Sequence, residues 1–193
     1  MKGQANFIEY IFTILLSVVV VIAITLLVYG FYRNLIENEV KQELRQIVIQ
    51  TSDQIVRLYD VARASKAQPT NYTSLLLSEV DLNLPRQASN KNYDVLLVSS
   101  SQLVSIISLV TIDGLNVSNT VSGANAKVVA RTNDDPEIEV EYDIPNIDVS
   151  VQGKASDGVN ATLRYYRYNI NGVLYDTIVL GPYDILVRLS GVS

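Results

Sequence analysis

Cysteine and histidine are both absent from this chain of 193 residues. The absence of cysteine excludes a disulfide framework and a thiol nucleophile, and it gives no information on the redox compartment. Without histidine the chain lacks the commonest general base, and without either residue it lacks the usual ligands of transition metals. No glycine-rich phosphate loop follows a predicted strand, and no serine stands in a nucleophile-elbow pattern. These absences predict a protein that is not an enzyme and that holds no cofactor and no metal.

Basic residues are also in the minority. Lys and Arg number 15 against 20 Asp and Glu, which gives a formal net charge of −5. A protein that binds nucleic acid, or one held on anionic lipid by a basic patch, carries the opposite excess. We therefore expect no nucleic-acid partner.

A long apolar run near the start of the chain predicts a transmembrane helix over residues 4–32. No charged residue occurs between Tyr10 and Tyr32, and a helix of that length spans roughly 35 Å, enough to cross a hydrocarbon core of about 30 Å. Aromatic side chains stand at both ends of the run, where they prefer the membrane interface. No small-residue cleavage site follows, so we interpret the run as a retained membrane helix rather than a secretory signal peptide or a buried helix of a soluble protein.

Glu9 is the only acidic residue before Glu37. One interpretation is that it lies close enough to the membrane interface to remain hydrated, because burying a lone carboxylate costs a few kcal/mol. The other is that it neutralises an α-amine on a neighbouring helix, which requires a cut after Gly3, a new amine on Gln4 and an assembly that excludes water. Gly3 and Gln4 are therefore candidate processing residues, and Glu9 is a candidate assembly residue.

The charges that flank the apolar run predict its orientation. Lys2 lies on one side, whereas Arg33 on the other side is accompanied by Glu37 and Glu39. The positive-inside tendency then places the N-terminus in the cytoplasm and the rest of the chain outside the cell membrane. Three N-x-S/T acceptor motifs lie beyond the run, as expected of an exported domain. Their asparagines, which are candidate glycosylation sites, are Asn71, Asn116 and Asn160.

Helical periodicity continues past the apolar run and predicts an amphipathic extension over residues 33–66. Apolar or small side chains recur there at every third or fourth position. They are Ile36, Val40, Leu44, Ile47, Thr51, Ile55, Leu58 and Ala62. Pro69 disfavours helix in the residue before it, so the helix should end before Gln68. We expect this stripe to pack against the chain's own head or against neighbouring helices; an isolated coiled-coil dimer is the alternative.

A β-rich head is predicted over residues 70–193. The expected strands are 93–99, 104–111, 126–132, 138–144, 148–152, 161–170, 173–180 and 185–189. Alternating apolar and acidic residues make 138–144 a half-buried strand, and Asn171-Gly172 is a strong hairpin signal, with Asp113-Gly114 a weaker one. The predicted fold class is α+β, in which a long transmembrane and amphipathic helix precedes an antiparallel β-sandwich-like head.

Two clusters in the head each allow two interpretations. The acidic residues between Asp134 and Asp143 offer oxygen ligands for Ca²⁺, but alternate residues of one strand lie too far apart to surround an ion, which favours a solvated face that protects an edge strand. The tyrosines and arginines of residues 163–170 allow a carbohydrate-binding or partner-binding face. A packed strand with aromatic cross-strand pairs is the favoured interpretation.

Lys2-Gly3-Gln4, Glu9 and the apolar run form a pattern that resembles the class III signal peptide of archaeal type IV pilin-like proteins. The amphipathic extension and the β-rich head are also similar to that family, as is a Leu-Pro segment at residues 82–85 followed by a tyrosine-containing strand at residues 92–95. In that family the glutamate is usually the fifth residue after the cut, whereas Glu9 would be the sixth.

The resemblance implies a specific life history for the chain. Residues 1–3 would be a leader that a prepilin peptidase removes between Gly3 and Gln4 on the cytoplasmic side. The apolar helix would be kept, first in the membrane and then in the core of a surface filament. The implied partners are the membrane, the peptidase, copies of this chain or other pilins, and an S-layer or surface ligand for the head. The size of the head favours a minor or specialised pilin.

A second hypothesis is a permanently membrane-anchored extracytoplasmic binding protein, archaellum stator-like or S-layer-associated, that never polymerises. Cleavage of the leader discriminates between the two. A third, an extracytoplasmic enzyme such as a glycosidase, requires two carboxylates about 5–10 Å apart in a cleft. The sequence places no such pair.

Overall fold

The computed structural model describes residues 2–70, 73–100, 110–112, 120–121, 125–134, 136–156, 160–182 and 187–189. The chain divides into two compact units, residues 1–39 and residues 40–193. The part of the amphipathic extension that follows Glu39 therefore belongs to the same unit as the strands.

One continuous helix, α1 (Lys2–Ala64), carries both the apolar run and the amphipathic extension. It ends five residues before Pro69, and its last turn is closed by a hydrogen bond from the Ser65 amide to the Ala62 carbonyl, 3.0 Å long. The predicted stripe is confirmed within residues 40–64, where all seven of its members are buried. These are Val40, Leu44, Ile47, Thr51, Ile55, Leu58 and Ala62.

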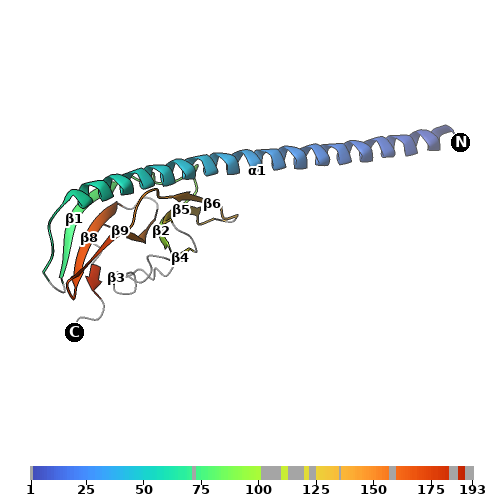
Figure 1. Cartoon of the computed structure of the whole chain (residues 1–193). Coiled ribbons are helices and arrows are strands. Elements are labelled where there is room, and N and C mark those ends of the chain that lie inside the picture. The colour runs from blue at the N-terminus through green and yellow to red at the C-terminus, as the bar shows by residue number, and fades with distance from the viewer. Residues whose placement is uncertain are drawn as a thin grey trace. The chain divides into compact units, whose positions relative to one another are not determined.

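The described part of the head is built from ten strands. They are β1 (Thr73–Leu82), β2 (Tyr93–Ser100), β3 (Val110–Ile112), β4 (Thr120–Val121), β5 (Lys127–Thr132), β6 (Glu139–Asp143), β7 (Ser150–Ser156), β8 (Ala161–Ile170), β9 (Val173–Pro182) and β10 (Val187–Leu189). Seven strands form a sheet in the order β1-β8-β9-β7-β2-β5-β6, with β4 paired to β2 as its eighth strand, while β10 and β3 form a separate pair. The C-terminal half of α1 runs along this sheet (Figure 1). The α+β class with a β-rich head is thus confirmed.

The sheet differs from the prediction in one respect, because it is mixed rather than wholly antiparallel. Strands β7 and β9 pair in parallel, and so do β2 and β4. The parallel β7–β9 pair arises because β8 lies on the far side of β9 and returns to it through a hairpin. The prediction was wrong here because the spacing and alternation of strands define their number and faces but not their neighbours.

The β8–β9 hairpin is confirmed at Asn171-Gly172. Both residues have positive φ angles, 55° and 81°, as a two-residue hairpin loop of this sequence requires. The Asn169 side-chain oxygen accepts a hydrogen bond of 3.0 Å from the Gly172 amide. Ten residue pairs follow in register from Ile170↔Val173 to Ala161↔Pro182. The weaker signal, Asp113-Gly114, lies outside the described residues.

Strand β1 has no counterpart among the predicted strands. It pairs with β8 along its whole length, from Thr73↔Asn169 to Leu82↔Ala161, with a register shift between Leu76 and Ser78. The Leu-Pro segment that follows it is fixed by Tyr93, whose hydroxyl donates a hydrogen bond of 2.6 Å to the Pro85 carbonyl. Strand β1 thus pairs with a strand that begins about eighty residues after β1 ends, so this pairing is a long-range contact.

The core of the head lies between the C-terminal half of α1 and the sheet. Val40, Leu44, Val48 and Ile55 on the helix are fully buried. On the sheet the largest fully buried side chains include three tyrosines and several aliphatic residues from β2, β8 and β9. They are Tyr93, Tyr165, Tyr168, Leu97, Leu163, Ile178 and Leu180. The rings of Tyr59 on the helix and Tyr165 on β8 have their centroids 6.4 Å apart, which places β8 directly under α1.

Candidate membrane-spanning segment and helix clamp

The N-terminal unit presents an apolar helix surface on every side. Every residue from Glu9 to Leu35 except Gly30 is exposed, and between them they include 19 large hydrophobic side chains such as Leu27, at 73% exposure. Among the described residues, α1 is the one helix long and apolar enough to cross a membrane. An exposed apolar surface of this kind marks a segment that functions in lipid or against another protein.

The serine and threonine hydroxyls within the apolar run are satisfied inside the helix. Thr13 donates to the Glu9 carbonyl, Ser17 to the Thr13 carbonyl and Thr25 to the Val21 carbonyl, each at 2.8 Å. Such bonds to the carbonyl four residues back leave no free polar hydrogen on these side chains to face lipid. These three side chains are thus compatible with a hydrocarbon environment.

The predicted processing and assembly residues all lie on this helix. Gly3 and Gln4 are in the first turn of α1, and Glu9 is exposed. Glu9 is five positions after Gln4, which corresponds to about 7.5 Å of helix rise. Their roles in processing and assembly remain predictions.

A polar contact of Tyr59, supported by Arg63 on the same helix, fastens the last turns of α1 to the strands of the head. The Tyr59 hydroxyl donates a hydrogen bond of 2.6 Å to the Asp148 carboxylate, and it accepts one of 3.0 Å from Arg63. The Arg63 guanidinium also lies 5.7 Å from the centre of the Tyr59 ring. Tyr59 therefore joins the helix to the segment just before β7.

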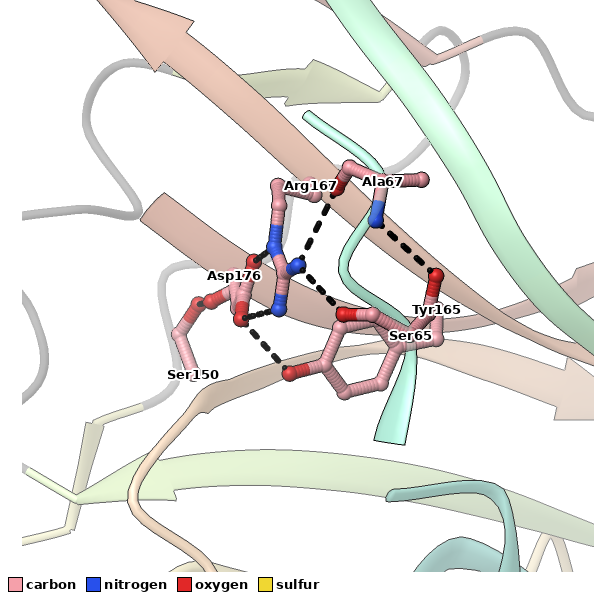
Figure 2. Close-up of polar contacts among 6 residues, drawn as sticks. All are labelled: Ser65, Ala67, Ser150, Tyr165, Arg167 and Asp176. Carbon is pink, nitrogen blue, oxygen red and sulfur yellow. Dashed lines mark hydrogen bonds and ion pairs between the residues drawn. The ribbon is translucent and has the colours of Figure 1, made fainter. Parts of the chain in front are cut away.

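Arg167 holds the chain just past the end of α1 (Figure 2). Its Nε and Nη2 bind the two oxygens of Asp176 at 2.8 and 2.9 Å, so the pair is bidentate. Its Nη1 donates to the carbonyls of Ser65 and Ala67, both at 3.2 Å. Tyr165 completes the group by donating 2.8 Å to the second Asp176 oxygen. We call these five residues the Arg167 clamp.

The register of the hairpin explains why the clamp forms. Arg167 and Asp176 are directly opposite each other on β8 and β9, and Tyr165 shares their face two residues away. The positive guanidinium also lies beside carbonyls that follow the C-terminus of a helix, where positive charge is stabilising. One side chain thereby joins the hairpin to the end of α1.

The tyrosines at these two contacts, Tyr59 and Tyr165, stay in the hydroxyl form. Burial raises the pKa of Tyr165 far above its ordinary value, and the Asp176 carboxylate raises it further. Burial and Asp148 likewise raise the pKa of Tyr59, while Arg63 opposes them. The hydrogen bonds that Arg167 donates to the Asp176 carboxylate are the main cause of its raised pKa. Both phenols therefore remain hydrogen-bond donors to carboxylates at any physiological pH.

The favoured interpretation of residues 163–170 is confirmed in that this segment is a packed strand, but its described ring contacts are within β8 and with α1 rather than between strands. Tyr165 and Tyr168 are almost wholly buried, and Arg164 is 7% exposed. The Tyr166 and Tyr168 rings contact each other at 6.1 Å. Sequence reasoning singled out this segment but missed the clamp, because its partners Ser65 and Asp176 lie on other elements.

The acidic residues near Asp143 form an exposed face on an edge strand, as expected. Strand β6 is the last strand of the sheet, and Glu139, Glu141 and Asp143 are exposed. Lys127 on β5 forms an ion pair of 2.6 Å with Glu141. Within the described residues no group of carboxylates is arranged to hold a metal ion. The prediction of a half-buried strand is only partly right. Ile138 and Ile144 are buried, but Tyr142, which shares their predicted face, is 36% exposed.

The three glycosylation candidates differ in what the structure describes. Asn160 is exposed and immediately precedes β8. Asn71 and Asn116 lie outside the described residues.

Three comparisons with known proteins bear on this chain. No protein-family model, no curated protein and no solved structure matches it. Its function is therefore argued from its own residues.

Replacing Asp176 by Asn should destabilise the head by about 2–4 kcal/mol, because a largely buried guanidinium loses its charged partner. The exposed fractions of the two side chains are 12% and 21%, so solvent reduces the loss only in part. Urea unfolding of the full chain in detergent, followed by circular dichroism, measures it. Glu141→Gln, which removes an exposed ion pair, is the control and should change stability by no more than about 0.5 kcal/mol. Equal losses of stability in the two variants would show that the Arg167 clamp does not stabilise the head.

Proposed function

We propose that this chain is a structural subunit, of minor or specialised kind, of an archaeal type IV pilus-like surface filament. The change in character of α1 along its length supports the proposal. From Tyr10 to Tyr32 the helix is apolar and exposed on nearly every side, whereas from Val40 it buries one stripe in its own head. A helix that is apolar all round requires apolar surroundings on every side. Lipid provides them before assembly, and neighbouring helices provide them in the filament.

Assembly of such helices requires more than hydrophobicity. Lipid tails are as apolar as leucine, so moving from lipid into a helix bundle gains little hydrophobic free energy. Association then depends on close packing and on polar contacts between helices. Glu9 is the only acidic group available near the apolar run.

Glu9 provides that polar contact in the proposed filament. A prepilin peptidase cuts after Gly3 and exposes an α-amine on Gln4. The Glu9 carboxylate of one subunit accepts hydrogen bonds from this amine on the next subunit. In an apolar bundle an unpaired charge is strongly unfavourable, so the pair fixes the register of neighbouring helices. The β-rich head is carried outside the cell, where an S-layer or another surface ligand is its partner in adhesion.

The N-terminus of the native protein tests the processing step. Mass spectrometry of the protein purified from cell surfaces should identify Gln4 as the first residue. An intact Met1 in surface filaments would contradict processing. An intact Met1 in a protein found only in the membrane fraction would support a permanently anchored binding protein instead.

Glu9→Gln should reduce the number of surface filaments at least tenfold while the membrane-bound amount of the protein stays unchanged. The reason is that losing one partner of a buried charge pair costs about 3–5 kcal/mol, which corresponds to more than tenfold in an equilibrium constant. Electron microscopy of cell surfaces and quantitative blotting of membranes measure the two quantities. Glu39→Gln is the matched control, because Glu39 is an exposed residue of the same helix beyond the apolar run. Normal filaments in the Glu9 variant would rule out its role in assembly.

A further inference from the structure

The acceptor motif Asn160-Ala161-Thr162 lies at the start of β8 and is described in full. Asn160 is exposed, whereas Ala161 and Thr162 are 1% and 2% exposed. Within the part of the chain that the structure describes, the Asn160 side chain makes no hydrogen bond. The acceptor asparagine is therefore accessible, while the rest of its motif is part of the sheet.

The hydroxyl that the motif requires is already engaged in the folded head. Thr162 donates a hydrogen bond of 3.2 Å to Asp81, the residue opposite it in the β1–β8 ladder. An N-x-S/T motif depends on the hydroxyl two residues after the asparagine. A modifying enzyme cannot reach this hydroxyl unless β1 and β8 separate.

We propose that Asn160 is an N-glycosylation site and that its glycan is added before β1 pairs with β8. In this reaction the Asn160 amide nitrogen, Nδ2, forms a bond to the anomeric carbon of a lipid-linked oligosaccharide. The bond from that carbon to the phosphate of the lipid carrier breaks, and the lipid phosphate leaves with the bonding electrons. The amide loses one proton. The inference rests on the proposed exported location of the head.

The folded head accommodates such a glycan without rearrangement. Asn160 precedes the first residue of β8, so it has no place in the hydrogen-bond ladder. Its exposed side chain lets an attached sugar extend into solvent. The folded head can therefore carry a glycan on Asn160, but the glycan must be attached before the head has folded.

Glycopeptide mass spectrometry tests the site. The full-length chain is expressed in cells that have an N-glycosylation pathway, together with Asn160→Gln, Thr162→Val and Thr162→Ser. The wild-type chain and Thr162→Ser should carry glycan on Asn160, and the other two variants should carry none there. An impermeant amine label on intact cells reports export of the head independently. If the head is labelled but Asn160 carries no glycan, this inference alone is overturned. If the head is not labelled, the proposed function is overturned as well.

A second measurement tests the order of events. Unglycosylated full-length chain in detergent is incubated with a purified oligosaccharyltransferase and a lipid-linked oligosaccharide. Leu82→Asp, which places a charge at a buried position of β1 directly opposite Ala161, is compared with the wild type. Modification of Asn160 should be at least tenfold faster in the variant. Equal rates would overturn the requirement that glycosylation precedes strand pairing.

Discussion

A chain that lacks residues 1–39 is expected to stay in aqueous solution, whereas the full-length chain is expected to require detergent. Leu, Ile, Val and Phe each favour the bilayer centre by about 0.3–0.6 kcal/mol, so the 17 such residues of residues 4–32 give about 5–10 kcal/mol. The shortened chain begins at Val40, the first residue of the unit that contains the buried stripe and all strands. Ultracentrifugation of carbonate-washed membranes measures the difference.

Two single substitutions provide a matched control for this experiment. Val21→Arg places a charge near the middle of the apolar run and should lower the membrane-bound fraction markedly, because a central arginine costs about 2.5–3.5 kcal/mol. Leu35→Arg adds the same charge beyond Tyr32 and should leave that fraction nearly unchanged. A full-length chain that remains in the supernatant without detergent would contradict the membrane interpretation.

Gly153→Ala is expected to destabilise the head by about 4 kcal/mol or more, which places it among the most damaging single substitutions. Gly153 has a φ of +124°, and a Cβ atom there would lie 1.9 Å from the Leu180 carbonyl oxygen. This oxygen belongs to the backbone of β9, in the middle of the sheet, so it cannot move aside without breaking the β7–β9 ladder. Urea unfolding in detergent measures the loss of stability.

Gly172→Ala is the control, because it shares the unfavourable backbone angle without the collision. Gly172 has a φ of +81°, and nothing lies within 4 Å of the added Cβ position. Its cost should be about 1–2 kcal/mol, the usual penalty for a left-handed residue. If both variants lose the same stability, the close approach of β7 and β9 is not the cause.

Periodicity in the sequence predicts much of the fold because local patterns reflect which faces are buried. The stripe from Val40 to Ala62 and the hairpin at Asn171-Gly172 both follow from local rules of this kind. Strand β1 was missed because its three consecutive leucines, Leu75–Leu77, break the alternation that identifies a half-buried strand. The parallel pairing of β7 with β9 depends on long-range contacts that no local pattern records.

The candidate site was predictable to different degrees. The apolar run is visible from composition alone, since it depends only on residues next to each other in the chain. The Arg167 clamp is not, because Arg167 binds the carbonyl of a residue about a hundred positions earlier. One signal was overlooked: a glycine inside a strand, such as Gly153, often marks a place where another backbone approaches closely.

The position of β9 in the sheet has a consequence for the sequence of events during synthesis. Strands β1 and β8 lie on one side of it and β7, β2, β5 and β6 on the other, so among the described strands β9 alone links these two groups within the sheet. A ribosome completes Val173–Pro182 late, and β1 has waited through about eighty residues for its partner. The edge of the sheet formed by β1 therefore stays unpaired until β8 has been made. If the head is exported as proposed, an enzyme at the membrane surface has access to Thr162 only between the emergence of β8 and its pairing with β1.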